Sequence, residues 1–197
     1  MRLVRKDWQK YLRKTGGAAD YAIIDPPWNY NDHPPKLDGQ LDYTLWGENA
    51  DCLASLIERI DVKYMFLWAP SSMLDVPFQV CREQTAYIYK TLVTWVKLTK
   101  GGKLHYGLGH HFRNTSEHLV VMAQKGVKPM RSSLRNVHMG EARGRTGKPR
   151  ALEISILASL ADKGMSRGFY LFAGATELDC FKPYDIDLVD VAIGESA

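Results

Sequence analysis

The chain has 197 residues, 45% of them hydrophobic, with a formal net charge of +4 and a pI near 8.9. This size and apolar content predict one domain over residues 1–197, and the mildly basic charge permits a polyanionic partner without requiring one. Three widely spaced cysteines argue against a disulfide framework and against a zinc site, and no apolar run suits a signal peptide or membrane span, so we expect a cytoplasmic protein without membrane association.

The predicted elements alternate between strands and helices. Residues 21–24 are a continuous apolar run stopped by two prolines, typical of a strand buried in a parallel sheet, and the polar residues 31–43 predict a long exposed loop. Further strands are predicted over 62–68, 88–98, 117–123 and 168–172, and helices over 49–60, 73–87 and 149–164. Residues 125–148 predict a mobile basic connection. The alternation indicates an open, mainly parallel α/β sheet that binds ligands beyond the carboxyl ends of its strands.

The candidate catalytic element is Asp25-Pro26-Pro27-Trp28, directly after the first predicted strand. Its successive prolines lack amide donors and have fixed φ angles, so the turn is rigid and its carbonyls are free to accept hydrogen bonds. The Asp25 carboxylate is another acceptor, and the Trp28 indole offers a flat face for stacking. These groups suit an NH₂ group on an aromatic ring. The alternative is structural: Asp25 caps a turn, the prolines end a strand, and Trp28 belongs to the core.

An amine on an aromatic ring is a weak nucleophile because its lone pair is delocalised into the ring. Hydrogen bonds from its two N–H groups to the Asp25 carboxylate and the Pro26 carbonyl favour a tetrahedral nitrogen in the transition state. The pattern therefore predicts a group transfer to an exocyclic amine.

Other segments support a family resemblance through their order along the chain. They are Tyr43-Thr44, Phe66-Leu67-Trp68, Trp95-Val96-Lys97, residues 109–117 (GHHFRNTSE), Lys148-Pro149 and Leu171-Phe172. With the tetrapeptide, they make the chain from about residue 7 to about residue 177 resemble the family of the seventy-kilodalton subunit of the mRNA adenosine methyltransferase. The resemblance implies a Rossmann-like class I methyltransferase, with helices on both faces of the sheet and a catalytic strand that precedes the cofactor-binding strand. It favours a bacterial or phage member.

The resemblance also implies S-adenosylmethionine as methyl donor, S-adenosylhomocysteine as product and no metal. Asp7 and Trp8 stand at the family's spacing, eighteen positions before the catalytic aspartate for Asp7. Lys148 resembles the lysine that reaches the methionine carboxylate at a helix N-terminus. Gly174 replaces a family arginine. The implied cofactor-binding residues are Asp7, Trp8, Asp25, Lys148, Phe172, Gly174, Thr176 and Glu177.

The implied target is the N6 amine of adenine, which must be extruded from a duplex or be single-stranded to react. Candidate substrate-binding residues are Tyr30, Tyr43, Lys97, Arg113 and Asn114, with Tyr43 equally consistent with a core position. His33 and Lys36 are further candidates in the loop. The arginines 131, 135, 143, 145 and 150 fit either a phosphate-tracking surface or a solvated basic loop. Trp68 and Trp95 are expected in the core, and His110 and His111 in structural or exposed positions.

We therefore expect a nucleic-acid methyltransferase acting on adenine N6, with DNA favoured over RNA because the bacterial and phage relatives are thought to methylate DNA. RNA methylation stays open, as does a catalytically silent subunit that binds nucleic acid or a partner. Asp25 disfavours a cytosine N4 enzyme, whose turn more often begins with serine. The sequence leaves open a homodimer or a heterodimer.

Overall fold

The structure is a computed structural model that describes residues 1–4, 8–28, 49–83, 86–107, 109, 111–142, 147–172 and 178–189. Its strands are β1 (Arg2–Val4), β2 (Ala18–Ile24), β3 (Asp61–Pro70), β4 (Tyr87–Leu98), β5 (Ser116–Gln124), β6 (Val137–Glu141), β7 (Arg167–Leu171) and β8 (Asp185–Val189). Its helices are α1 (Trp8–Thr15), α2 (Asn49–Ile57), α3 (Asp75–Glu83) and α4 (Arg150–Ala161), with 3₁₀ turns at Ser71–Met73 and Leu178–Phe181. None of the helices described is long and apolar enough to cross a membrane.

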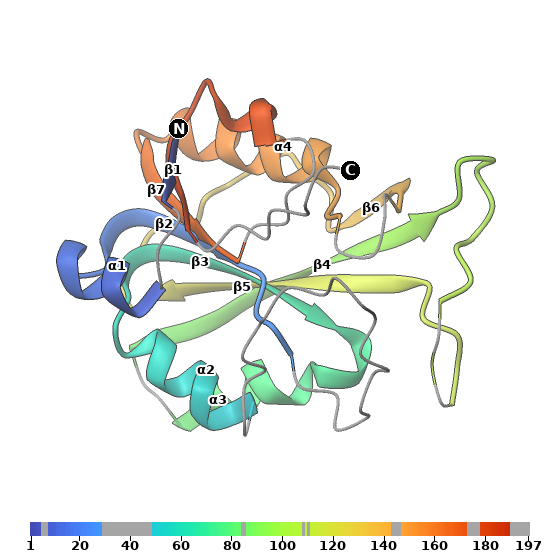
Figure 1. The fold of residues 1–197 in the computed structure, drawn as a ribbon, viewed down its shortest axis with the longest axis horizontal. Helices are drawn as coiled ribbons and strands as arrows, with labels where there is room; N and C mark the ends of the chain where they lie inside the picture. Colours follow the sequence, from blue (N-terminus) through green and yellow to red (C-terminus); the bar gives the residue numbers. More distant parts are fainter. Residues whose placement is uncertain are drawn as a thin grey trace.

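The strands form one sheet in the order β1-β8-β7-β2-β3-β5-β4-β6 (Figure 1). Its neighbouring strands pair in parallel, except that β5 runs antiparallel to both β3 and β4. The mainly parallel sheet is therefore confirmed. Because β5 is reversed, its first residues lie at the same edge of the sheet as the last residues of β2, β3 and β4. That edge carries the candidate active site.

Helices cover both faces of the sheet, with α4 on one side and α2 and α3 on the other (Figure 1). Alternation along β2 supplies both cores, since successive side chains of a strand point to opposite faces. Ala22 and Ile24 pack in the core that includes α1 and α2, whereas Tyr21 and Ile23 pack in the core that includes α4. The same alternation directs Asp25 toward the α4 face.

The close packing of β7 against β2 depends on Gly168. It stands opposite Tyr21 in the parallel pairing, and a Cβ atom at position 168 would lie 2.1 Å from Tyr21 Cε2. Without a side chain at this position, the aromatic ring can cross β7 at van der Waals distance. The pairing continues past β2, where Asp25 N donates to Leu171 O at 3.1 Å.

The predicted strands and helices are confirmed, with ends that differ by a few residues. One expectation is wrong in part: residues 125–148 are not wholly without regular structure, because Val137–Glu141 forms β6 against the outer edge of β4. Backbone pairing from Thr94↔Val137 to Leu98↔Glu141 orders this strand although its two apolar side chains, Val137 and Met139, are exposed. The predicted loop over residues 31–43 lies outside the described residues.

Candidate active site

The Asp-Pro-Pro-Trp turn is held at both of its ends. Trp28 N donates to Pro26 O at 2.9 Å, and the Trp28 indole Nε1 donates to Trp68 O, at the end of β3, at 3.1 Å. The Trp28 side chain is 6% exposed and packs in the core. Trp28 therefore anchors the turn, while its use as a stacking platform stays a prediction. The Pro26 carbonyl keeps a second lone pair for another donor.

A chain of alternating charges begins at Asp25. Lys148 Nζ lies 2.9 Å from Asp25 Oδ1 and 3.2 Å from Glu117 Oε2, and Lys97 Nζ lies 2.6 Å from Glu117 Oε1. These side chains are at most 18% exposed. Two carboxylates and two ammonium groups thus compensate one another in a largely desolvated cluster, as buried charges require.

The sheet topology explains why residues so distant in sequence meet here. Glu117 stands opposite Pro70 of β3 and Trp95 of β4, because the start of antiparallel β5 lies beside the ends of both strands. Lys97 follows Trp95 by two positions and so points to the same face. Lys148 enters the cluster from the α4 face, directly before Pro149 and the first turn of α4.

The surroundings of Asp25 disfavour its charged form. Burial raises its pKa, the Lys148 ammonium lowers it, and the Glu117 carboxylate raises it again, which leaves the pKa at about 6 instead of 3.8. Burial also opposes ionisation of Glu117, but the attraction of Lys148 and Lys97 outweighs it and lowers the Glu117 pKa. The Lys148 pKa is lowered by burial but raised more strongly by Asp25 and Glu117, so it is raised overall. Lys148 thus stays a cation between the two carboxylates.

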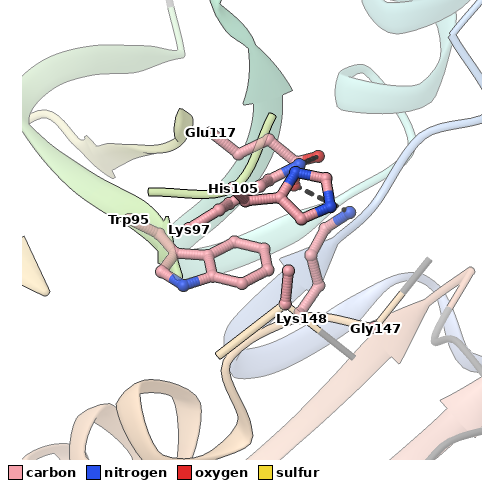
Figure 2. A pocket seen from close by; sticks show the side chains of 7 residues that line it. Trp95, Lys97, His105, Glu117, Gly147 and Lys148 are labelled. Atoms are coloured by element: carbon pink, nitrogen blue, oxygen red, sulfur yellow. Dashed lines mark hydrogen bonds and ion pairs between the residues drawn. The ribbon is translucent and has the colours of Figure 1, made fainter. Parts of the chain in front are cut away.

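A cavity of about 420 Å³ opens beside this charged cluster. Figure 2 shows the Glu117, Lys97 and Lys148 side chains meeting at it, with the Trp95 indole and the His105 imidazole alongside. Its lining residues are Trp95, Lys97, His105, Glu117, Ala142, Gly147 and Lys148. Lys148 lines the cavity and contacts Asp25, so the candidate catalytic carboxylate lies directly behind the wall of a space of the size that small ligands occupy, about 300–1,000 Å³.

A buried network holds α4 against the sheet behind the cluster. Glu153 accepts hydrogen bonds from Arg150 at 2.6 Å, from the Tyr170 hydroxyl at 2.7 Å and from the Trp68 indole at 2.9 Å. Arg150 and Glu153 are 5% and 1% exposed. Both alternatives given for Arg150, a phosphate-tracking surface and a solvated basic loop, are therefore wrong: its guanidinium is buried against Glu153 and fixes the start of α4, next to Lys148.

The predicted cofactor side of the site lies beyond the ends of β2 and β7. The rings of Trp8 and Phe172 meet edge to face, with centroids 6.2 Å apart, and Phe172 adopts a φ of 61° that non-glycine residues rarely take. The donor set fits S-adenosylmethionine: the Asp25 carboxylate and the Lys148 ammonium match the charges of its amino-acid group, and the aromatic pair suits its adenine. Asp7, Gly174, Thr176 and Glu177 lie outside the described residues.

The predicted substrate residues divide between the cavity and a projecting loop. Lys97 lines the cavity, whereas Arg113 lies on the connection between β4 and β5, stacked on the Tyr106 ring at 4.8 Å, with Asn114 half-buried beside it. His111 on this connection is exposed. Tyr30, Tyr43, His33, Lys36 and His110 lie outside the described residues. Trp68 and Trp95 are buried as expected, and Trp95 also lines the cavity.

Three residues of this region were not predicted from the sequence: Glu117, His105 and Glu153. Glu117 is the last residue of the segment GHHFRNTSE and directly precedes an apolar run, so the sequence does place a carboxylate at the start of a predicted strand. That signal points to the active-site edge only once the reversed direction of β5 is known. No group of three or more His, Cys, Asp or Glu side chains in the described part of the chain is arranged to hold a metal ion.

An α/β sheet with Asp-Pro-Pro-Trp at its carboxyl edge, beside a charged cavity, defines a Rossmann-like methyltransferase. The chain belongs to the MT-A70 family, whose sequence model matches residues 19–173. This match confirms the resemblance and supports an S-adenosylmethionine-dependent methyltransferase acting on adenine N6. No curated protein matches the chain.

Proposed function

We propose that the protein methylates the N6 amine of adenine in DNA, with Asp25 and the Pro26 carbonyl as the groups that bind this amine. The observation that carries the proposal is the position of Asp25. Its largely buried carboxylate lies at the end of central strand β2 and contacts Lys148, which lines the cavity. The rigid turn holds the Pro26 carbonyl next to it.

The proposed step needs an acceptor for each N–H of the amine. The Asp25 carboxylate accepts one hydrogen bond and the Pro26 carbonyl accepts the other, which draws the N6 lone pair out of the ring. The donor supplies a methyl group already activated by its sulfonium. The N6 lone pair would form the bond to the methyl carbon while the electrons of the carbon–sulfur bond stayed on sulfur, and the proton released by N6 would pass to the ionised Asp25 carboxylate and from there to solvent. With a pKa of about 6, ionised Asp25 is a suitable acceptor near neutral pH.

Lys148 is proposed to serve both sides of the reaction centre. Asp25 and Glu117 occupy two of the three N–H donors of its ammonium. In this proposal the third N–H of the Lys148 ammonium donates to the carboxylate in the methionine part of S-adenosylmethionine. In this role Lys148 orients Asp25 and neutralises the cofactor, while Lys97 balances Glu117.

Access to Asp25 requires an unpaired base. The Asp25 side chain is 14% exposed, so an adenine stacked within a duplex cannot bring N6 to the carboxylate. We propose that the target nucleotide is extruded or single-stranded. The projecting β4–β5 connection supplies a contact for the strand: Tyr106 and Phe112 are 73% and 87% exposed, and Arg113 stacks on Tyr106.

The choice of DNA over RNA rests on the resemblance to bacterial and phage relatives. It is tested by incubating the protein with labelled S-adenosylmethionine and matched DNA and RNA oligonucleotides, each single- and double-stranded. Mass analysis of the nucleosides identifies the methylated base. We expect N6-methyldeoxyadenosine from DNA. Label in RNA alone would reverse the assignment of the polymer, and N4-methylcytosine would overturn the assignment of the base.

A further inference from the structure

A second cavity lies on the face of the sheet that α4 covers, and it shares no lining residue with the first. It has a volume of about 410 Å³ and is lined by residues of β3, β4, β5, α4 and the connection over residues 125–136 between β5 and β6. Apolar side chains make up much of its wall, among them Phe66, Val93, Val121 and Ile156. Its size is within the range of small-ligand sites, so it can hold a flat group such as a nucleobase.

This second cavity carries positive charge that no carboxylate of the described residues balances. Lys90 of β4 and both Arg131 and Arg135 of the connection line it and are exposed, and none of them belongs to an ion pair within the described part of the chain. No aspartate or glutamate is among the described residues that line the cavity. Residues 125–136 hold two more basic side chains, Lys125 and Lys128, and no acidic one. These cations are therefore available to an anionic ligand.

The connection that carries the two arginines is fixed to the rest of the fold. The Tyr64 hydroxyl of β3 donates to the Lys128 carbonyl, and Ser132 Oγ lies 3.1 Å from Ser159 Oγ of α4. Arg131 adopts a φ of 48°, in the left-handed region that residues other than glycine seldom take. Such conformations persist only where the surrounding structure imposes them, and they cluster at ligand sites. The wall of the cavity is thus a built feature of the fold.

Strand β4 links the second cavity to the active site. Thr91 and Val93 line the second cavity, and Trp95 and Lys97, the next two residues that point to the same face, line the first. Val93 and Lys97 are about 13 Å apart along the strand, at about 3.3 Å per residue. Successive phosphates of a B-form strand rise by about 3.4 Å along the helix axis, so a few nucleotides span this separation.

We propose that the second cavity binds a non-target nucleotide of the substrate strand, with its base against the apolar wall and its phosphates at Arg131 and Arg135. This inference rests on the proposed function. A nucleotide matches the cavity in two respects, because its base has apolar faces and its phosphate is an anion. Of the two alternatives that the sequence left for these arginines, the cavity beside them favours the phosphate contact. The contact is tolerant of sequence, since an apolar wall accepts any base.

A cavity-filling substitution tests the base contact. Thr91→Trp places an indole in the cavity from a strand, where aromatic residues are favoured, and Ser133→Trp is the matched control at an exposed residue of the connection that does not line the cavity. Fluorescence anisotropy without methyl donor measures binding of labelled single-stranded DNA in which each non-target nucleotide in turn is abasic. The wild type and Ser133→Trp should lose about tenfold in affinity at one non-target position. Thr91→Trp should bind the intact strand about tenfold more weakly and be insensitive to that abasic site.

Charge-removing substitutions test the phosphate contact. Arg131→Asn introduces a residue that tolerates the left-handed φ, and Arg135→Gln keeps a polar side chain of similar shape. Each should lower the slope of log K against log salt by about 0.7, the value for one phosphate contact to a single strand. Arg82→Gln, at an exposed arginine on α3, should keep the wild-type slope. Thermal unfolding verifies the fold of every variant.

The inference is overturned if no non-target abasic site weakens binding by the wild type, if Thr91→Trp is as sensitive to that site as the wild type, or if both arginine variants keep the wild-type slope. Free thymidine monophosphate that binds the wild type as tightly as the strand does, and Thr91→Trp more weakly, would assign the cavity to a free nucleotide instead. Because the assay needs no methyl transfer, a wild type that binds as predicted but methylates no polymer refutes the proposed function and leaves this contact in place.

Discussion

The Lys148 ammonium lies 2.9 Å from Asp25 Oδ1 and 3.2 Å from Glu117 Oε2, so a single cation is shared by the proposed catalytic carboxylate and a second carboxylate. Lys148 attracts the charged form of Asp25, whereas Glu117 repels it. Ionisation of Asp25 therefore depends on a balance between two neighbours that come from opposite sides of the cavity.

Activity should fall as the pH decreases through about 6, because the proposed step needs ionised Asp25. Below this value we expect kcat/KM to drop about tenfold per pH unit. Glu117→Gln removes the repelling charge and should move the midpoint below that of the wild type, whereas Lys148→Met removes the attracting charge and should move it above. Rate profiles between pH 5 and 8 measure all three proteins. Midpoints that shift together, or in the reverse order, would contradict the account.

Asp25→Asn should be more stable than the wild type at pH 8. Because the folded-state pKa of about 6 exceeds the usual 3.8, the Asp25 carboxyl destabilises the fold increasingly as the pH rises from about 4 to 6 and fully above pH 6, and contributes nothing once it is protonated in both states. The difference corresponds to at most about 3 kcal/mol. Thermal unfolding at pH 8 and pH 4 should show a higher Tm for the variant only at pH 8. A lower Tm at pH 8 would argue that the Lys148 pair outweighs the cost of burial.

Glu153→Gln should destabilise the protein by about 3–5 kcal/mol, because it removes the buried carboxylate that pairs with Arg150 and accepts from Tyr170 and Trp68. The matched control is Asp179→Asn in the exposed pair with Lys182, which has the same three-residue spacing and should change stability by less than about 1 kcal/mol. Urea unfolding measures both variants. Equal effects would show that burial does not distinguish the two pairs.

Gly168→Ala should disrupt the contact between β7 and β2, since the new Cβ atom would lie 2.1 Å from the Tyr21 ring. We expect a loss of stability or of soluble protein, and partial recovery when Tyr21→Ala removes the ring. Gly101→Ala, where the nearest atom is 4.0 Å away, is the control. A double-mutant cycle by urea unfolding quantifies the coupling. Additive effects of the two substitutions would be evidence against this contact.

Arg113→Ala should weaken nucleic-acid binding and leave kcat at saturating substrate nearly unchanged, because Arg113 stacks on Tyr106 away from the charged cluster. If Arg113 contacts a phosphate, the slope of log K against log salt should fall by about 0.7–0.9. Arg82→Ala, an exposed arginine on α3, is the matched control. Fluorescence anisotropy with a labelled oligonucleotide at several salt concentrations provides the slopes. Equal slopes for wild type and Arg113→Ala would remove this residue from the proposed interface.

Sequence patterns predicted the central elements because these are long or strongly apolar. The run before Asp25 and its two prolines located both the strand and the turn. The short strands β1 and β6 at the two edges of the sheet, and β8 next to β1, were missed, since their order depends on pairing with a neighbour's backbone and not on their own pattern. Helix α1 was also not predicted, although its sequence carries a helical signal in the spacing of Trp8, Tyr11 and Leu12.

The site was predictable to the extent that its residues belong to a local motif. Asp25 and Lys148 were identified as site residues, but their direct pairing was not, because a charge pair between distant segments follows from topology. Glu117 required knowledge that β5 is antiparallel. His105 had no motif at all, and its place on the cavity wall exists only in the folded chain.

The most direct test of the central claim is the transfer of labelled methyl to adenine N6 in oligonucleotides by the wild type, by Asp25→Ala, and by Asp51→Ala, an exposed aspartate on α2, as control. We predict N6-methyladenine from the wild type and the control, and a rate about 10²–10³-fold lower from a folded Asp25→Ala protein. Equal labelling by the wild type and Asp25→Ala, or no N6-methyladenine from the wild type, would contradict the account.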